Sequence, residues 1–89
     1  MYEFHFYSAS WCSSCRAYKP NVDQFIEQHP EIQLNYKDVD TGNNMQEAQE
    51  YGIKSLPFTV VKKDGSDIGS FPGIKTVSEL NDWWKGLSK

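Results

Sequence analysis

Trp11-Cys12-Ser13-Ser14-Cys15 is the stretch that decides how this 89-residue sequence is interpreted, because it holds both of the chain's cysteines. A disulfide between Cys12 and Cys15 would close a very short loop, and the stabilisation that a disulfide contributes grows with loop length. A purely structural disulfide is also unexpected in a reducing compartment. The spacing therefore indicates redox chemistry, half of a metal site, or coincidence, rather than a bridge that stabilises the fold.

The residues around the pair predict a strand that leads into a helix. Phe4 and Phe6 alternate with His5 and Tyr7 within residues 1–7, which is the two-residue period of a strand. After a short turn, apolar side chains follow the period of a helix and predict one buried stripe. This stripe consists of Tyr18, Val22, Phe25 and Ile26.

The predicted helix gives the two cysteines different surroundings. Counting back along the stripe, Cys15 belongs to the buried face and Cys12 lies at the first turn. Ser10 or Trp11 is then expected near the N-cap, where serine is a favoured residue. Pro20 interrupts the pattern and should kink the helix.

A cysteine at a helix N-terminus faces unsatisfied N–H groups and the positive end of the helix dipole, and both favour the thiolate. Because the thiolate is the nucleophile, Cys12 is the predicted attacking residue. Arg16, one turn beyond Cys12, is expected to add to this stabilisation, whereas Lys19 is interpreted as part of a solvated face. Cys15, one turn deeper, is the predicted resolving cysteine.

The rest of the sequence completes an α/β pattern within one domain, residues 1–89. Alternating residues and turn signals predict three further strands and two further helices. The strands cover residues 32–36, 58–63 and 67–71, and the helices cover residues 45–51 and a final segment that opens with the capping box 76–79. Asp64-Gly65 predicts a hairpin turn. The order β-α-β-α-β-β-α implies a mixed four-stranded sheet with three helices distributed over both faces.

Charge and hydropathy disfavour several classes of function. A net charge of −3 disfavours a nucleic-acid binder, which needs a basic face. No apolar run approaches the length of a membrane span. The first residues, Met1 to Phe4, lack the features of a signal peptide, so we expect a cytoplasmic protein. We also expect a monomer without a bound cofactor.

Metal binding and docking are alternatives to redox chemistry. His29 lies fourteen residues beyond Cys15, about 20 Å along one helix, and His5 is expected to face the sheet. One chain would thus offer at most three sulfur or nitrogen ligands, fewer than a structural zinc site needs. A metal or iron–sulfur cluster shared between two chains stays open. So does a docking subunit that uses the fold without redox turnover.

With these residues placed, the sequence resembles the thioredoxin family over nearly its whole length. Trp11-Cys12-Ser13-Ser14-Cys15 is similar to that family's W-C-x-x-C site. Further matches are the helix proline Pro20, the Leu56-Pro57 pair at the family's cis-proline, the hairpin turn Asp64-Gly65 and the loop Pro72-Gly73-Ile74. The sequence begins at the family's second strand, as in short phage-type thioredoxins and glutaredoxins. The C-P-Y-C centre and Gly-Gly-x-Asp turn of glutaredoxins are not seen.

The resemblance implies a thioredoxin-like fold and a protein-disulfide reductase. It implies that an incoming peptide pairs with the backbone at the cis-proline while its sulfur meets Cys12. The implied substrate groove consists of Trp11, Ser13, Ser14, Leu56, Pro57, Gly73 and Ile74. Electrons would come from NADPH through a thioredoxin reductase, and ribonucleotide reductase is one substrate that the family suggests.

Three departures from the family carry their own expectations. Ser13-Ser14 replaces the usual Gly-Pro, and hydroxyls that stabilise a thiolate would make the couple more oxidising than roughly −270 mV. Phe6 stands where the family has a buried aspartate, with His5 and Tyr7 pointing to the opposite face. Cys15 would therefore lack a dedicated base. The absent first strand would leave one sheet edge less covered.

Overall fold

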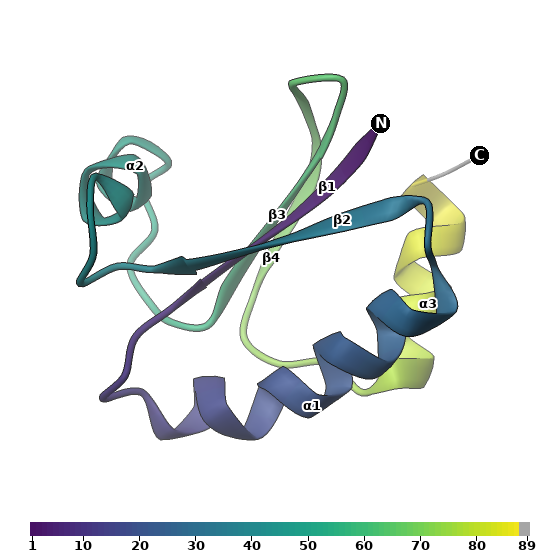
Figure 1. The fold of residues 1–89 in the computed structure, drawn as a ribbon, viewed down its shortest axis with the longest axis horizontal. Coiled ribbons are helices and arrows are strands. Elements are labelled where there is room, and N and C mark those ends of the chain that lie inside the picture. Colours follow the sequence, from purple (N-terminus) through teal and green to yellow (C-terminus); the bar gives the residue numbers. More distant parts are fainter. Residues whose placement is uncertain (88–89) are drawn as a thin grey trace.

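A four-stranded sheet forms the centre of the structure, a computed structural model that describes residues 1–87 (Figure 1). The strands are β1 (Tyr2–Ser8), β2 (Ile32–Asp38), β3 (Phe58–Lys63) and β4 (Ser66–Pro72), in the spatial order β2-β1-β3-β4. β1 pairs parallel with β2 and antiparallel with β3, and β3 pairs antiparallel with β4. The predicted mixed sheet is confirmed, and β2 is one of its edges within the described residues.

Three helices cover the sheet, namely α1 (Ser13–Gln28), α2 (Asn44–Glu50) and α3 (Val77–Leu87). Figure 1 shows α1 and α3 together on one side of the sheet, with α2 beyond the end of β2. Edge contacts between the Phe25 and Trp84 rings join α1 to α3. On the opposite face, the Tyr7 hydroxyl donates a hydrogen bond to Glu47 of α2 at 3.2 Å. The prediction of helices on both faces is therefore confirmed.

Aromatic rings fix α1 against the sheet. The Phe4 ring lies 5.9 Å from that of Phe25, and the Phe6 ring lies 5.3 Å from that of Tyr18. All four side chains are fully buried. Burial of each contributes roughly 1.5–3 kcal/mol, so this layer holds α1 in place relative to β1. The side chains on one face of β1 thus pack against the predicted apolar stripe of α1.

Two local structures that were predicted in the second half of the sequence, a hairpin turn and a capping box, are present. Asp64 and Gly65 both have positive φ, 52° and 86°, as a two-residue hairpin turn requires. At the start of α3 the Thr76 hydroxyl accepts a hydrogen bond from the N–H of Glu79 at 3.1 Å, and the Glu79 carboxylate accepts one from the N–H of Thr76 at 2.9 Å. This reciprocal pair is the predicted capping box.

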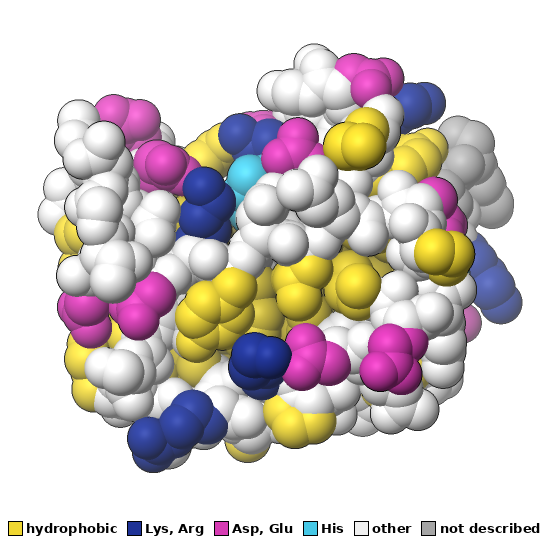
Figure 2. Space-filling view, viewed as in Figure 1, with side chains coloured by type: hydrophobic (Ala, Val, Ile, Leu, Met, Phe, Trp, Pro, Cys, Tyr) yellow, Lys and Arg dark blue, Asp and Glu magenta, His cyan; other side chains and the backbone are white. Residues whose placement is uncertain are grey.

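The charge distribution on the surface and the polarity of the helices can be compared with the classes of function that the sequence disfavours. On the face shown in Figure 2, Lys/Arg and Asp/Glu side chains are interspersed around a hydrophobic patch and form no continuous basic region. This face therefore lacks the continuous basic region that nucleic-acid binding requires. Within residues 1–87, every helix is too short or too polar to cross a membrane.

The buried His5 predicts a pH dependence of stability. Burial lowers the pKa of His5 below its ordinary 6.5, Lys37 and Lys62 lower it further, and Glu3 opposes them. Below pH 6.5 the unfolded chain therefore binds more protons than the folded one. The free energy of unfolding therefore decreases as the pH is lowered, by at most ~1.4 kcal/mol per pH unit. We expect a weaker slope in His5→Gln, measured by urea unfolding between about pH 5 and pH 7. Equal slopes in both proteins would refute this.

Candidate active site

Cys12 and Cys15 form a disulfide at the N-terminus of α1. Cys12 is the N-cap residue, and its sulfur accepts a hydrogen bond from the N–H of Cys15 at 3.2 Å. The prediction of Ser10 or Trp11 as the cap was wrong, because the cysteine sulfur takes the position that a serine oxygen usually holds. As the N-cap, the Cys12 sulfur itself lies against the free N–H groups and the positive end of the helix dipole, and both favour a thiolate at Cys12.

The two sulfurs differ in access. Cys12 retains 8% of its surface exposed, whereas Cys15 retains 1% and belongs to the hydrophobic core. A disulfide is exchanged by in-line attack of one sulfur on another, so the attacking sulfur must be reachable from outside. The geometry therefore favours Cys12 as the residue that meets a substrate and Cys15 as the residue that resolves the intermediate.

The two serines and the arginine near the pair occupy different positions. Ser13 and Ser14 are both exposed to solvent, but the Ser14 hydroxyl lies 3.4 Å from the Cys12 sulfur. The Arg16 guanidinium is also exposed, and it donates a hydrogen bond to the Ser10 carbonyl at 3.3 Å. Arg16 thus secures the turn before Cys12. Its stabilisation of a Cys12 thiolate stays a prediction.

The predicted groove residues from the second half of the chain come together around one peptide bond. The Leu56–Pro57 bond is cis. The N–H of Gly73 donates a hydrogen bond to the Pro57 carbonyl at 2.9 Å, and Gly73 has φ +77°, a conformation that favours glycine. The side chain of Ile74 is exposed immediately after this contact. The loop that follows β4 is therefore attached to the start of β3.

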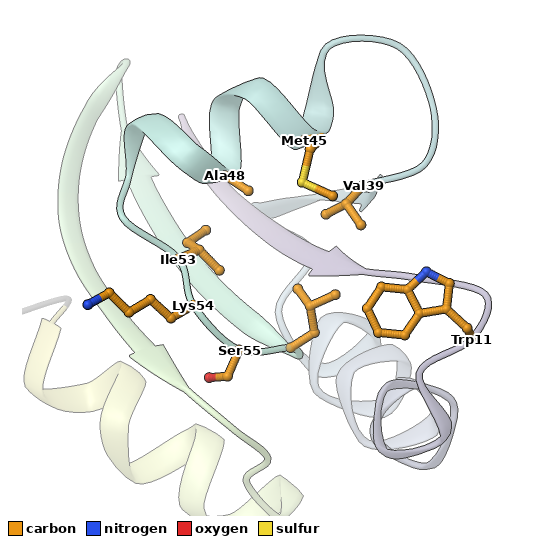
Figure 3. A pocket seen from close by; sticks show the side chains of 8 residues that line it. Trp11, Val39, Met45, Ala48, Ile53, Lys54 and Ser55 are labelled. Carbon is orange, nitrogen blue, oxygen red and sulfur yellow. The ribbon is translucent and has the colours of Figure 1, made fainter.

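Trp11, the residue before Cys12, and Leu56 both line an open apolar cleft of about 290 Å³. Figure 3 shows the Trp11 ring at one side of this cleft. Trp11 is 66% exposed, so its ring forms a wall of the cleft rather than part of the core. The remaining lining comes from the end of β2, from α2 and from the segment before Pro57, and consists of Val39, Met45, Ala48, Ile53, Lys54 and Ser55. The sequence predicted Trp11 and Leu56 as substrate contacts, and the structure places both on this surface.

Sequence reasoning missed the α2 side of the cleft. Met45 and Ala48 are three residues apart on one face of α2, and that spacing was a signal for an apolar helix face. Val39 and Ile53 carried no local signal. The N–H of Val39 donates a hydrogen bond to the Ser8 carbonyl at 2.9 Å, so its place beside the site depends on the pairing of β2 with β1.

The position where the resemblance expects a buried aspartate is apolar in the structure as well. Phe6 is fully buried, and its ring lies 5.3 Å from the rings of both Tyr18 and Tyr36. Tyr7, its neighbour in sequence, contacts α2 on the opposite face, as predicted. The layer under the cysteines therefore holds aromatic rings in place of a carboxylate.

No cluster of three or more His, Cys, Asp or Glu side chains within residues 1–87 is arranged to hold a metal ion. His29 caps the far end of α1, where its ring contacts Asn81 of α3 at 2.6 Å. The structure therefore separates His29 from the cysteines by the length of α1.

A thioredoxin family model matches residues 4–86 of the chain. The chain is 35% identical over 65 residues to thioredoxin 1 of Synechococcus elongatus, a match covering 73% of this chain and 60% of that protein. It is 34% identical over 79 residues to thioredoxin of Pyropia yezoensis, covering 84% of this chain and 73% of that protein. The chain spans only part of the length of each relative.

Solved structures share the fold. Thioredoxin from Fasciola hepatica superposes with a TM-score of 0.83 at 27% identity, covering 97% of this chain and 80% of that one. A mutant thioredoxin from Halobacterium salinarum superposes with a TM-score of 0.84 at 25% identity, covering 99% and 75%. The arrangement of sheet and helices described above is therefore the thioredoxin fold.

Replacing Ser14 tests the contact between its hydroxyl and the Cys12 sulfur. A hydrogen bond to a charged group contributes roughly 1.5 kcal/mol, so losing one from a Cys12 thiolate destabilises the reduced form. We expect Ser14→Ala to shift the reduction potential by about 30 mV toward more reducing values, measured against a glutathione redox series. The control is Ser13→Ala, which removes an exposed hydroxyl from the same turn. Equal potentials in both variants would show that the Ser14 contact has no role.

Proposed function

We propose that this chain, which belongs to the thioredoxin family, reduces disulfide bonds in proteins by dithiol exchange through Cys12 and Cys15. The family match and the Cys12–Cys15 disulfide support a thiol–disulfide oxidoreductase. One observation carries the proposal. The sulfur that caps α1 is the accessible one, and its partner lies beneath it in the core. This is the arrangement that a two-step exchange requires.

The first step forms a mixed disulfide. The Cys12 thiolate attacks one sulfur of the substrate disulfide, a bond between these two sulfurs forms, and the other substrate sulfur leaves as a thiolate that takes a proton from water. In the second step the Cys15 thiolate attacks the Cys12 sulfur and the second substrate sulfur leaves in the same way. The substrate gains two electrons, and Cys12 and Cys15 lose two electrons as their disulfide forms.

The surface around the cysteines suits a polypeptide substrate. The backbone at the cis bond before Pro57 is proposed to pair with an extended peptide, and the exposed Trp11 and Ile74 are proposed to contact its side chains. The cleft between Trp11 and Leu56 is proposed to take an apolar side chain close to the substrate cysteine. Backbone pairing and apolar contacts recognise no single sequence, so a range of proteins would be accepted.

The reaction must be completed by an external reductant. We propose that a thioredoxin reductase supplied by NADPH restores the dithiol, and that the protein acts as a cytoplasmic monomer without a bound cofactor. Proteins with accessible disulfides are the proposed substrates, and ribonucleotide reductase is one candidate. The family to which the chain belongs is the support for these partners.

A docking subunit is the second candidate function. The observation that favours it is the exposed apolar surface formed by Trp11, Ile74 and the cleft, which could bind a partner whatever the redox state. Replacing both Cys12 and Cys15 by serine separates the two functions, because a docking role survives this change and a reductase role does not.

Insulin reduction by dithiothreitol tests the reductase directly. We expect the wild-type protein to accelerate the precipitation of insulin chains and Cys12→Ser to lose this acceleration, since the nucleophile is gone. Cys15→Ser should react once and stop at the mixed disulfide. A folded wild-type protein without any acceleration would contradict the proposal and favour the docking subunit.

A charge in the cleft tests the substrate contact. Met45→Glu places a carboxylate on an apolar, partly exposed wall, and burying an apolar substrate side chain there contributes roughly 1.5–3 kcal/mol. We expect about a tenfold loss of insulin reduction, with reduction of a small disulfide such as hydroxyethyl disulfide unchanged. Gln46→Glu adds the same charge at the next residue, which does not line the cleft. Equal losses in both variants, or on both substrates, would remove the cleft from the proposal.

A further inference from the structure

Two buried hydroxyl groups in the layer between α1 and the sheet have no use in the steps described so far. The side-chain oxygens of Tyr18 and Thr59 are both fully buried, and within residues 1–87 neither has a hydrogen-bond partner outside this pair. Buried polar atoms are almost always paired, because an unpartnered one costs free energy. A second polar atom, or a second state of the protein, is therefore expected to satisfy them.

The two hydroxyls lie together beside Phe6. Thr59 is the direct neighbour of Phe6 across the pairing of β1 with β3, so both side chains point to the same face of the sheet. The ring of Tyr18 lies 5.3 Å from that of Phe6 on this face, and its hydroxyl is next to the hydroxyl of Thr59. The pair thus occupies the same layer as the position where the family carries its carboxylate.

Cys15 and Tyr18 belong to the same buried cluster. Tyr18 follows Cys15 by three residues on the buried face of α1. Side chains of a helix lean toward its N-terminus, so the Tyr18 ring covers the turn that Cys15 begins. Thr59 follows Pro57 by two residues at the start of β3. The hydroxyl pair therefore lies in the buried layer to which Cys15 also belongs.

Cys15 needs stabilisation of its thiolate in the second step of exchange. Its sulfur is buried, and burial in apolar surroundings raises the pKa of a thiol. Phe6 supplies neither a base nor a hydrogen bond. In the disulfide form neither hydroxyl makes a hydrogen bond to the Cys15 sulfur. A thiolate at Cys15 would provide an acceptor.

We propose that the Tyr18 hydroxyl donates a hydrogen bond to the Cys15 thiolate, and that the Thr59 hydroxyl donates one to the Tyr18 oxygen. This inference rests on the proposed exchange reaction, and it assigns to two hydroxyls the stabilisation of Cys15 that the site lacks at Phe6.

The proton balance of the second step keeps both hydroxyls intact. The Cys15 thiol releases its proton to water, and the resulting thiolate forms the bond to the Cys12 sulfur. The bond between Cys12 and the substrate breaks, and the substrate thiolate takes up a proton from water. Burial raises the pKa of Tyr18 far above neutrality, so its hydroxyl stays protonated and acts as a donor rather than a base.

The test measures the ionisation of Cys15 alone. In the Cys12→Ser background, the Cys15 thiolate is titrated by its ultraviolet absorbance, with and without Tyr18→Phe or Thr59→Val. We expect Tyr18→Phe to leave at least tenfold less thiolate at a given pH. Thr59→Val should have a smaller effect in the same direction. An unchanged Cys15 titration in Tyr18→Phe would overturn the proposal.

A matched control is available on the same layer. Tyr36→Phe also removes a hydroxyl from a ring that packs on Phe6, but this hydroxyl already donates to Ser8 at 2.9 Å. We expect it to leave the Cys15 titration unchanged, and a shift as large as that of Tyr18→Phe would overturn the specific assignment. Tyr18→Phe keeps the buried ring and its packing on Phe6, so we expect the variant to fold.

A kinetic measurement separates this proposal from the proposed function. Release of a thiol from a mixed disulfide preformed on Cys12 reports the second step, and its rise with pH should move to higher pH in Tyr18→Phe. If the wild-type protein fails to reduce insulin while the Cys15 titration responds to Tyr18→Phe, the hydroxyl assignment stands and the reductase proposal fails. If the wild-type protein reduces insulin while the Cys15 titration is unchanged in Tyr18→Phe, the reductase proposal stands and only the hydroxyl assignment is overturned.

Discussion

The hydrogen bond from the N–H of Cys15 to the sulfur of Cys12 is the interaction on which the rest of the site depends. It makes a cysteine the N-cap of α1, so that one contact starts the helix and places a sulfur at the positive end of its dipole. It also sets the geometry in which one sulfur is accessible and the other is buried. The capping that stabilises the fold locally is therefore the same arrangement that prepares the redox chemistry.

The aromatic layer between α1 and the sheet holds this arrangement in place, and it carries a chemical consequence. Phe6 and Tyr18 fill the space under the cysteines and anchor the first turns of the helix. Apolar packing there strengthens the core, but it removes the carboxylate that would otherwise serve Cys15. The hydroxyls of Tyr18 and Thr59 are two fully buried polar groups in this layer. The same few side chains thus determine both the packing of α1 on the sheet and the polar groups available near Cys15.

Much of this could be predicted from the sequence, because its signals are local. Alternation along β1, the stripe of α1, the Asp64-Gly65 turn and the capping box at Thr76 each depend on residues close in the chain, and each formed as predicted. The N-cap was misplaced because a cysteine sulfur is an uncommon cap. The α2 wall of the cleft and the Tyr18–Thr59 pair were missed because they arise only when strands far apart in sequence are paired.

The central claim is that Cys12 is the sulfur that substrates meet. Trapping the intermediate tests it most directly, by incubating Cys15→Ser with a disulfide-linked peptide and mapping the adduct by mass spectrometry. We expect a stable mixed disulfide on Cys12, and little reaction of Cys15 in Cys12→Ser over the same time. An adduct that forms equally fast on Cys15, or no adduct on Cys12 of the folded protein, would contradict it.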